Sequence, residues 1–231
     1  MKKIYRIKNG ENFLILDTET LSIDMPLIYN IGWQIVDRRG IIKSRQSFLI
    51  EEVWKNQDLF KTAYYSSKKE FYEEQLRSGE ITVNSYLAVV RLLWLDMHKH
   101  NISLLGAYNA KFDFEAIHFS NDYFYPEKEI TKYLLGDKKL FDIWLNAGLV
   151  IYRKKEYKNF CLENNFLTKG GYIQGTAEVG YRYLINNPRF IENHTAIEDV
   201  EIETEIFQEV LKNTNGIITL GLQDFIFKVY N

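Results

Sequence analysis

The hydrophobic pattern of this 231-residue chain changes from strand-like runs near the N-terminus to helical spacing farther along. The strand-like runs have the length of buried β-strands and cover 13–16, 27–36 and 41–50. A polar turn, Asp37–Gly40, separates the second run from the third, so these two runs are predicted to form an antiparallel hairpin. The segment 51–80 is aromatic and rich in charge, which is typical of short helices or loops.

Helices and short strands alternate along the rest of the chain. The predicted helices cover 82–97, 109–117 with Asn109 as the cap, 157–164, 176–185 and 195–211. A short strand is predicted at 104–107, and 140–143 is predicted to be a strand end or a helix start. Three strands followed by this alternation predict an α/β fold, a mixed sheet flanked by helices. We expect a single domain over 1–231, with the apolar tail 217–231 docked on it.

The last predicted helix has a clear start signal. Thr195 and Glu198 form the pattern of a capping box, in which the threonine hydroxyl accepts from a backbone N–H and the glutamate reaches back. Val200, Phe207 and Val210 then supply an inward-facing apolar stripe.

Composition places the chain among ordinary globular proteins, since 46% of the residues are hydrophobic and 26% are charged. The sequence contains no apolar run near the length of a transmembrane helix, and its first residues lack the apolar core of a signal peptide. Cys161 is the only cysteine, so no intramolecular disulfide is expected and a reducing, cytoplasmic location is predicted. The net charge of −2 argues against a strongly basic nucleic-acid binder.

Two acids lie where the first apolar run ends, in the sequence Leu14-Ile-Leu-Asp-Thr-Glu-Thr20. Residues i and i+2 of a strand point to the same face, so Asp17 and Glu19 face one way. Adjacent carboxylates repel, and either one is protonated or a cation lies between them. Hard oxygen ligands suit Mg²⁺ or Mn²⁺. A solvated strand end is the alternative explanation of this pair taken alone.

Two further segments contain acids in similar contexts. Asp113 lies just inside a predicted helix that follows a short strand. His194 and Asp199 are five residues apart, which on one continuous helix is a separation of about 140°. Because the helix is predicted to start at Thr195, His194 lies outside it, and the two side chains can reach the same point.

The order of these motifs resembles the DEDDh, or DnaQ-like, 3′–5′ exonucleases of the ribonuclease H-like superfamily. The motifs are D-x-E at Asp17, N-x-x-x-D from Asn109 to Asp113, and H-x-x-x-x-D from His194 to Asp199, and the resemblance covers 14–211. It implies a ribonuclease H-like mixed central sheet, antiparallel in its first three strands and parallel afterwards. Two further stretches resemble the family: 140–144, a strand with an extra acid at Asp142, and 160–165, the helix that follows.

The resemblance also implies the roles of the motif residues. Asp17, Glu19 and Asp199 would hold one Mg²⁺ or Mn²⁺, Asp17 would bridge to a second ion, and Asp113 would support that ion. His194 would be the general base. The expected reaction is two-metal hydrolysis that releases nucleoside 5′-monophosphates from 3′ ends.

Substrate contacts are expected beside these motifs. Thr18, Thr20 and Leu21 resemble the pocket in which the family binds the terminal sugar and base. Tyr108 and Asn109 flank the second motif, and Tyr108 stands where many members have a histidine that is not a metal ligand.

The net charge is a weaker argument against nucleic-acid binding once the predicted metal site is considered separately. Its four carboxylates belong to a total of 31 acidic residues, so 27 remain against 29 basic residues. Candidate contacts to a phosphate backbone are Lys68–Lys69, Lys138–Lys139 and Arg153–Lys155, although such a stretch is more often only a solvated surface.

The leading hypothesis is an exonuclease that acts on single-stranded DNA or a 3′ overhang. The alternatives are an exoribonuclease that trims short RNA, a proofreading subunit that requires a DNA polymerase or another replication or repair partner, and a catalytically silent nucleic-acid-binding scaffold. A silent relative is expected to lose acids or the histidine, and this chain retains all five positions.

Overall fold

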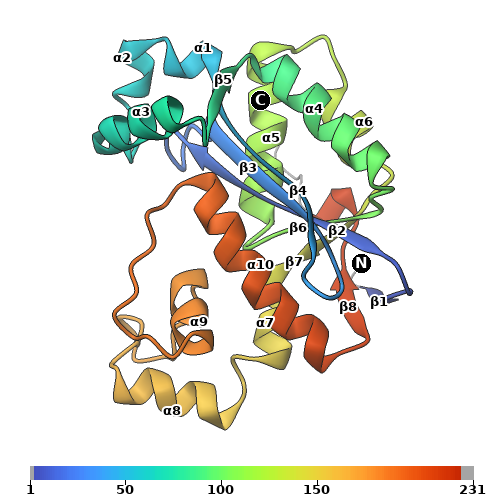
Figure 1. Cartoon of the computed structure of the whole chain (residues 1–231), viewed down its shortest axis with the longest axis vertical. Coiled ribbons are helices and arrows are strands. Elements are labelled where there is room, and N and C mark those ends of the chain that lie inside the picture. The colour runs from blue at the N-terminus through green and yellow to red at the C-terminus, as the bar shows by residue number, and fades with distance from the viewer. Residues whose placement is uncertain (1–2, 225–231) are drawn as a thin grey trace.

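The computed structural model describes residues 3–224 and has an α/β fold around a mixed sheet (Figure 1). Its strands are β1 (Lys3–Arg6), β2 (Asn12–Thr20), β3 (Ile28–Asp37), β4 (Ile42–Ile50), β5 (Thr82–Asn84), β6 (Leu104–Ala107), β7 (Lys139–Asp142) and β8 (Gly216–Thr219). Its helices are α1 (Glu51–Trp54), α2 (Gln57–Phe60), α3 (Lys69–Ser78), α4 (Tyr86–Lys99), α5 (Lys111–Phe124), α6 (Ile130–Leu135), α7 (Ile143–Val150), α8 (Lys155–Glu163), α9 (Ala177–Leu184) and α10 (Ala196–Asn213), with 3₁₀ turns η1 (Ser66–Lys68) and η2 (Leu222–Asp224).

The main sheet has the strand order β5–β4–β3–β2–β6–β7. Strands β2, β3 and β4 are antiparallel neighbours, whereas β6 and β7 run parallel to β2. This arrangement confirms the predicted fold class, a mixed sheet that is antiparallel in its first three strands and parallel afterwards. The carboxyl ends of β2, β6 and β7 meet at one edge, which is where open α/β sheets commonly carry their ligand sites.

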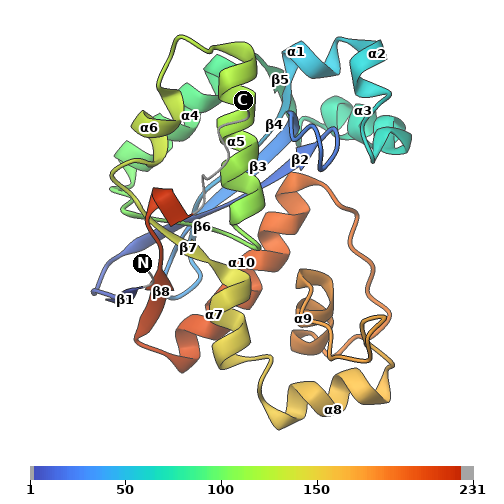
Figure 2. The same ribbon diagram turned by 180° about the vertical axis from the view of Figure 1, so that it is seen from behind.

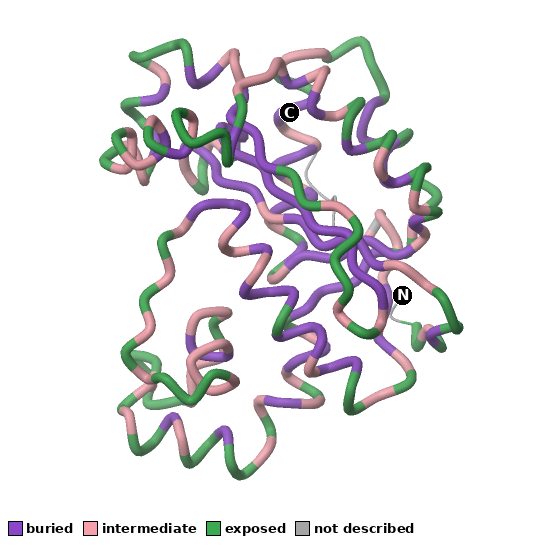
Figure 3. Tube along the Cα trace, in the orientation of Figure 1, coloured by how far each residue is buried: buried purple, intermediate pink, exposed green. Residues whose placement is uncertain are grey.

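The two faces of β2 are covered by different helices. Phe13 and Ile15 belong to a core cluster with residues of α7 and α10, and Leu14 and Leu16 belong to a second cluster with residues of α4 and α5. α10 crosses the sheet in Figure 1, and α5 lies on the opposite face, toward the viewer in Figure 2. Strands β2 and β3 between them are almost continuously buried, whereas the first half of β4 is largely exposed (Figure 3). Odd-numbered residues of β2 therefore face α10, and even-numbered residues face α5.

Three short strands are not predicted by the sequence pattern. β1 pairs with β8, and a bridge between Leu140 and Leu220 joins this ribbon to β7. β5 pairs with β4 where a continuous helix is predicted from Thr82; α4 begins instead at Tyr86, capped by the Ser85 hydroxyl. The predicted docking of the tail is confirmed as far as β8, and residues 225–231 lie outside the described residues.

Two predicted helix caps are wrong in their chemistry. Asn109 adopts a left-handed backbone with φ of 56°, and α5 begins after it with Ala110 at the cap position. Thr195 is the cap residue of α10, but its hydroxyl bonds to the Glu198 carboxylate at 3.0 Å and does not cap the helix. In the part of the chain described, no helix has the length and apolar character needed to cross a bilayer.

The first turn of α10 is docked on β3 by two residues. The buried Asn30 side chain accepts a hydrogen bond from the Ala196 N–H at 3.0 Å and donates one to the Phe48 carbonyl at 2.9 Å. Gly32 lies directly under the helix start: a Cβ there would lie 2.8 Å from the Ala196 carbonyl carbon and the Ile197 nitrogen. Strand β3 therefore caps the helix with the Asn30 side chain, and the helix can approach closely because Gly32 has no side chain.

A methyl group at position 32 is expected to push α10 away from the sheet. We expect Gly32→Ala to lower the free energy of unfolding by about 1–3 kcal/mol, the usual cost of overpacking a core. Chemical denaturation measures this loss. The matched control is Gly148→Ala in α7, where a Cβ meets nothing within 4 Å and a gain of about 0.5–1 kcal/mol is expected. Equal effects of the two substitutions would contradict the docking argument.

Candidate functional site

Three carboxylates converge where β2 ends beneath the start of α10. Asp17 and Glu19 are odd-numbered residues of β2, so both face α10. Their partners on the neighbouring strand β3 are Gly32 and Asn30. Asp199 lies in the first turn of α10. One oxygen from each of the three carboxylates lies within 4.8 Å of the other two. The close approach of the helix at Gly32 is what brings the third acid to the strand pair.

Asp113 approaches from the other face of the sheet. It lies in the first turn of α5, and its Oδ1 atom accepts hydrogen bonds from the Thr18 N–H at 3.0 Å and the Thr18 hydroxyl at 2.8 Å. Thr18 is even-numbered, which is why its side chain points toward α5. The buried Asp113 carboxylate thus lies beside Asp17 across the strand end, and the pKa of Asp17 is raised by burial and then by the charge of Asp113.

Glu203 is a further acid of this cluster that the sequence analysis does not single out. It lies one helical turn after Asp199, is 3% exposed, and accepts a hydrogen bond from the Tyr108 N–H at 3.2 Å. Its pKa is raised well above the usual value by burial and by the charges of Asp113 and Asp199. The signal in the sequence is the four-residue spacing from Asp199, which places both acids on one face of a helix.

Burial and mutual repulsion make the ionised cluster unfavourable without a cation. Burial raises the pKa of Asp199 to about 9 and that of Glu19 to about 8, and neighbouring carboxylates add to both shifts. Oδ1 of Asp199 is buried and has no hydrogen-bond partner among residues 3–224. Three oxygen donors with excess negative charge and an unpaired buried acceptor are suited to a hard divalent cation. The residues present therefore fit the predicted Mg²⁺ or Mn²⁺.

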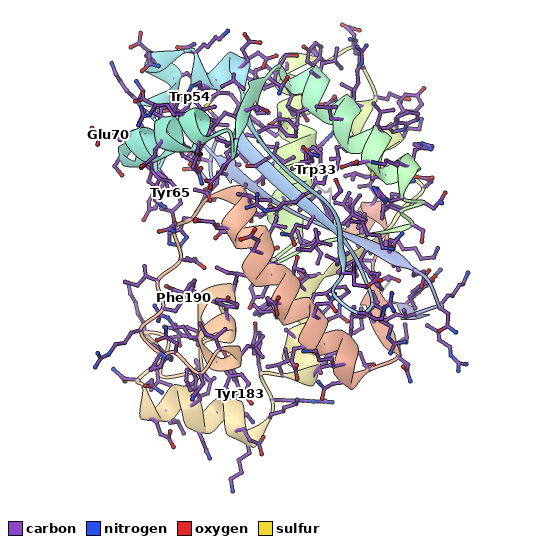
Figure 4. All side chains as sticks on the ribbon, in the orientation of Figure 1. Trp33, Trp54, Tyr65, Glu70, Tyr183 and Phe190 are labelled. Carbon is purple, nitrogen blue, oxygen red and sulfur yellow. The ribbon has the colours of Figure 1, made fainter. Side chains whose placement is uncertain are left out.

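His194 is held beside the acids by contacts from two segments. It has a left-handed backbone with φ of 50°, and its Nδ1 atom lies 2.8 Å from a carboxylate oxygen of Glu192. Its ring stacks on Tyr65 with centroids 5.0 Å apart and planes 12° from parallel. Tyr65 lies close to the N-terminal end of α10 in Figure 4. Ring nitrogen and carboxylate atoms of His194, Glu192 and Asp199 lie within 4.8 Å of one another.

Burial, followed by the positive charge of Lys68, lowers the pKa of His194 below its usual value. The Lys68 ammonium bonds to the carbonyl groups of Asn193 and His194 and lies over the Tyr65 ring, 4.1 Å from its centroid. The imidazole is therefore neutral near pH 7 and able to accept a proton. Neither Glu192 nor Tyr65 is predicted from the sequence, because no periodicity links 51–80 to the loop before α10.

The other predicted site residues occupy different environments. Tyr108 hydrogen-bonds through its hydroxyl to Tyr152 at 2.7 Å, and Asn109 is exposed beside it. Thr20 and Leu21 are buried at the end of β2, with Leu21 1% exposed in the core. Their predicted contact with a terminal nucleotide stays a prediction.

Asp142 has a structural role that its position at the end of β7 suggests. Its carboxylate caps α7 through the Leu145 N–H at 3.2 Å. It also accepts hydrogen bonds from the backbone N–H groups of Asn109 and Ala110. These bonds lower the pKa of Asp142, but burial has the larger effect, so the pKa is raised overall. Asp142 thus holds the loop of the second motif against the end of the sheet.

Two solved structures share the fold of this chain. E. coli Exonuclease I in complex with a dA16 oligonucleotide matches 88% of the chain with a TM-score of 0.51 at 14% sequence identity. The complex of the same enzyme with dT13 matches 88% with a TM-score of 0.54 at 13% identity. The match covers 41% of the Exonuclease I chain, so the present chain spans less than half of that protein. No protein-family model matches the chain. No curated protein sequence matches it either.

Metal-free protein is expected to lose stability as the pH rises. The pKa values of Glu19 and Asp199 in the fold, about 8 and about 9, exceed those of the unfolded chain. The folded state therefore binds more protons than the unfolded state between pH 5 and 9. The stabilisation that these protonated acids give the folded state is lost as the pH rises through the folded pKa values. In EDTA we expect the melting temperature to fall across this range, and Mg²⁺ to remove most of the fall.

Calorimetry or thermal melts with and without Mg²⁺ measure this dependence. The Asp17→Asn variant is the control, because removing one charge should flatten the slope in EDTA. A slope that is identical with and without Mg²⁺ in the unsubstituted protein would show that no divalent cation neutralises the cluster.

Proposed function

We propose that this chain is a metal-dependent 3′–5′ exonuclease acting on single-stranded or overhanging nucleic acid, with DNA favoured over RNA. The observation that carries the proposal is the convergence of Asp17, Glu19 and Asp199 beside His194. The fold shared with Exonuclease I supports it, and the oligonucleotides dA16 and dT13 in the complexes of that enzyme support a single-stranded substrate.

The acids at the end of β2 are the residues that would hold the cations. Asp17, Glu19 and Asp199 offer one set of oxygen ligands, and Asp113 lies beside Asp17 on the other side of the strand. Two divalent cations held there would supply positive charge that lowers the pKa of an attacking water and stabilises the departing 3′ oxygen. Glu203 lies behind these acids, and cations bound beside it would lower its raised pKa and favour its ionised form.

His194 is the proton acceptor of the proposed reaction. In this proposal the ring proton lies on Nδ1, which faces the Glu192 carboxylate 2.8 Å away, and the lone pair of Nε2 is free. A lowered pKa keeps the ring neutral at pH 7, so Nε2 can take the proton of the attacking water. Tyr65 fixes the ring plane by stacking, and Glu192 fixes its rotation.

Lys68 supplies positive charge beside the cluster. Its ammonium interacts electrostatically with Glu19 and Asp199 as well as with Glu192. This position beside the acids supports the prediction that Lys68 contacts a phosphate backbone, since a scissile phosphate must approach the same point.

Incubation with a 5′-labelled single-stranded DNA and its RNA counterpart tests the proposal. With Mg²⁺ or Mn²⁺ we expect a ladder that shortens from the 3′ end and disappears in EDTA, and the faster strand identifies the preferred sugar.

Asp17→Ala should abolish hydrolysis with the fold retained, because it relieves carboxylate repulsion. His194→Ala should lower kcat by about 10²- to 10⁴-fold, the usual contribution of a general base, with metal binding retained.

Intact substrate in every lane would contradict the proposal. Oligonucleotide binding without hydrolysis would then favour the silent scaffold, and hydrolysis that appears only when a DNA polymerase is added would favour the proofreading subunit. Loss of metal binding in His194→Ala would show that this histidine is a ligand and not the base.

Glu192 is predicted to act on the rate through His194. Glu192→Ala should lower kcat by about 10- to 100-fold, the range found for groups that orient active-site ligands, and should leave KM unchanged. Glu192→Gln keeps an oxygen acceptor for Nδ1–H and should recover part of the loss. Steady-state kinetics measure both variants. Glu205→Ala, at an exposed position of α10, is the surface control, and an equal loss in that variant would contradict the role.

A further inference from the structure

A groove around Trp144 adjoins the acidic cluster and has no assigned role. We propose that it binds nucleobases of the single strand upstream of the scissile bond, with Trp144 as the stacking surface. This inference rests on the proposed function and extends it to the substrate. Trp144 follows the Asp142 cap of α7 and the buried Ile143, and is itself 50% exposed.

Two cavities meet at Trp144. One, of 410 Å³, is lined by Tyr108, Asn109, Trp144, Gly175, Thr176 and Ala177. The other, of 320 Å³, shares Trp144 and Gly175 and continues past Tyr152 to Ile173 and Gln174. They form one groove with the indole between its halves. Each half is comparable to the few hundred Å³ typical of small-ligand sites.

The far wall of the groove is fixed by tyrosine hydroxyl groups. Tyr108 donates to the Gly175 carbonyl and contacts the Tyr152 hydroxyl, and Tyr157 donates to the Gln174 carbonyl at 2.8 Å. Gly175 packs so closely that a Cβ there would lie 3.3 Å from the indole nitrogen of Trp144. The loop is therefore held against the edge of the indole, and half of the side-chain surface stays open.

Tyr108 and Asn109 connect the groove with the candidate active site. Tyr108 lines the groove with its side chain, while its backbone N–H donates to Glu203 of the acidic cluster. Asn109 lines the groove and lies four residues before Asp113. A strand whose terminal phosphodiester reaches the acids can therefore continue directly onto the indole.

The chemistry of the lining favours bases over phosphates. The residues that line the two cavities are aromatic, aliphatic, glycine, or neutral polar, and none of them carries a charge among the residues described. Every base has a π-face, so stacking on an open aromatic ring is tolerant of sequence. Such a groove suits an enzyme that must advance along a strand one nucleotide at a time.

Substitution of Trp144 tests the proposal, with Trp94 as the matched control. Trp94 is 43% exposed but lies on α4, which packs against β4, far along the sheet order from β7. For long oligothymidylates we expect Trp144→Ala to raise KM about tenfold with kcat unchanged, the size of one lost base stack. A dinucleotide should show no change. Trp144→Phe should recover most of the affinity, and Trp94→Ala should match the unsubstituted protein.

Binding measured in EDTA separates this inference from the proposed activity. Fluorescence anisotropy of a labelled oligothymidylate should show the same tenfold loss for Trp144→Ala whether or not the chain hydrolyses the strand. Quenching of tryptophan fluorescence by the oligonucleotide should disappear in Trp144→Phe and persist in Trp94→Phe. Equal melting temperatures would establish that the variants are folded.

Several outcomes would overturn the inference. They are unchanged oligonucleotide affinity in Trp144→Ala, equal losses in the Trp144 and Trp94 variants, and absence of oligonucleotide binding by the unsubstituted chain. A change of oligomeric state in Trp144→Ala, measured by light scattering with oligonucleotide affinity unchanged, would instead assign the groove to contact between copies of the chain. If the chain hydrolyses every strand and the Trp144 substitutions have no effect, the exonuclease proposal stands and only the proposed role of the groove is refuted.

Discussion

The close approach of α10 to β3 is the contact on which the candidate site depends. It requires a glycine at position 32 and a buried amide at Asn30 that caps the helix in place of a local side chain. These two residues pair with Asp17 and Glu19 on the neighbouring strand. The same pair of positions therefore places the acids and brings Asp199 to them, so the helix docking and the carboxylate cluster are parts of one interaction.

This docking gathers like charges in a place where water is scarce. Asp17, Asp113 and Glu203 all have pKa values raised by burial, and each carboxylate raises the pKa of its neighbours. A site of this kind is a stable part of the fold only when protons or cations neutralise it. Packing by α10 on one face and α5 on the other resists that repulsion, which links the apolar core to the chemistry at its edge.

Local pattern in the sequence predicted much of this arrangement. The hairpin, the main helices and the common face of Asp17 and Glu19 follow from periodicity alone, and the structure has them. The short strands β1, β5 and β8 were missed because their pairing partners lie far away in the chain. Asn30 and Glu192 were missed for the same reason, because each contacts a residue that no local motif links to it. Glu203 was different, since its helical spacing from Asp199 was visible in the sequence.

The stacking of Tyr65 on His194 has a consequence for how such chains diverge. The segment that holds the histidine ring, from Tyr65 to Lys68, lies far in sequence from every acid of the cluster and belongs to none of the three motifs. Under the proposed function, substitutions in this loop can change the catalytic rate while every motif residue stays fixed. Two chains with identical motifs could then differ widely in turnover, and a comparison confined to the motifs would not separate them.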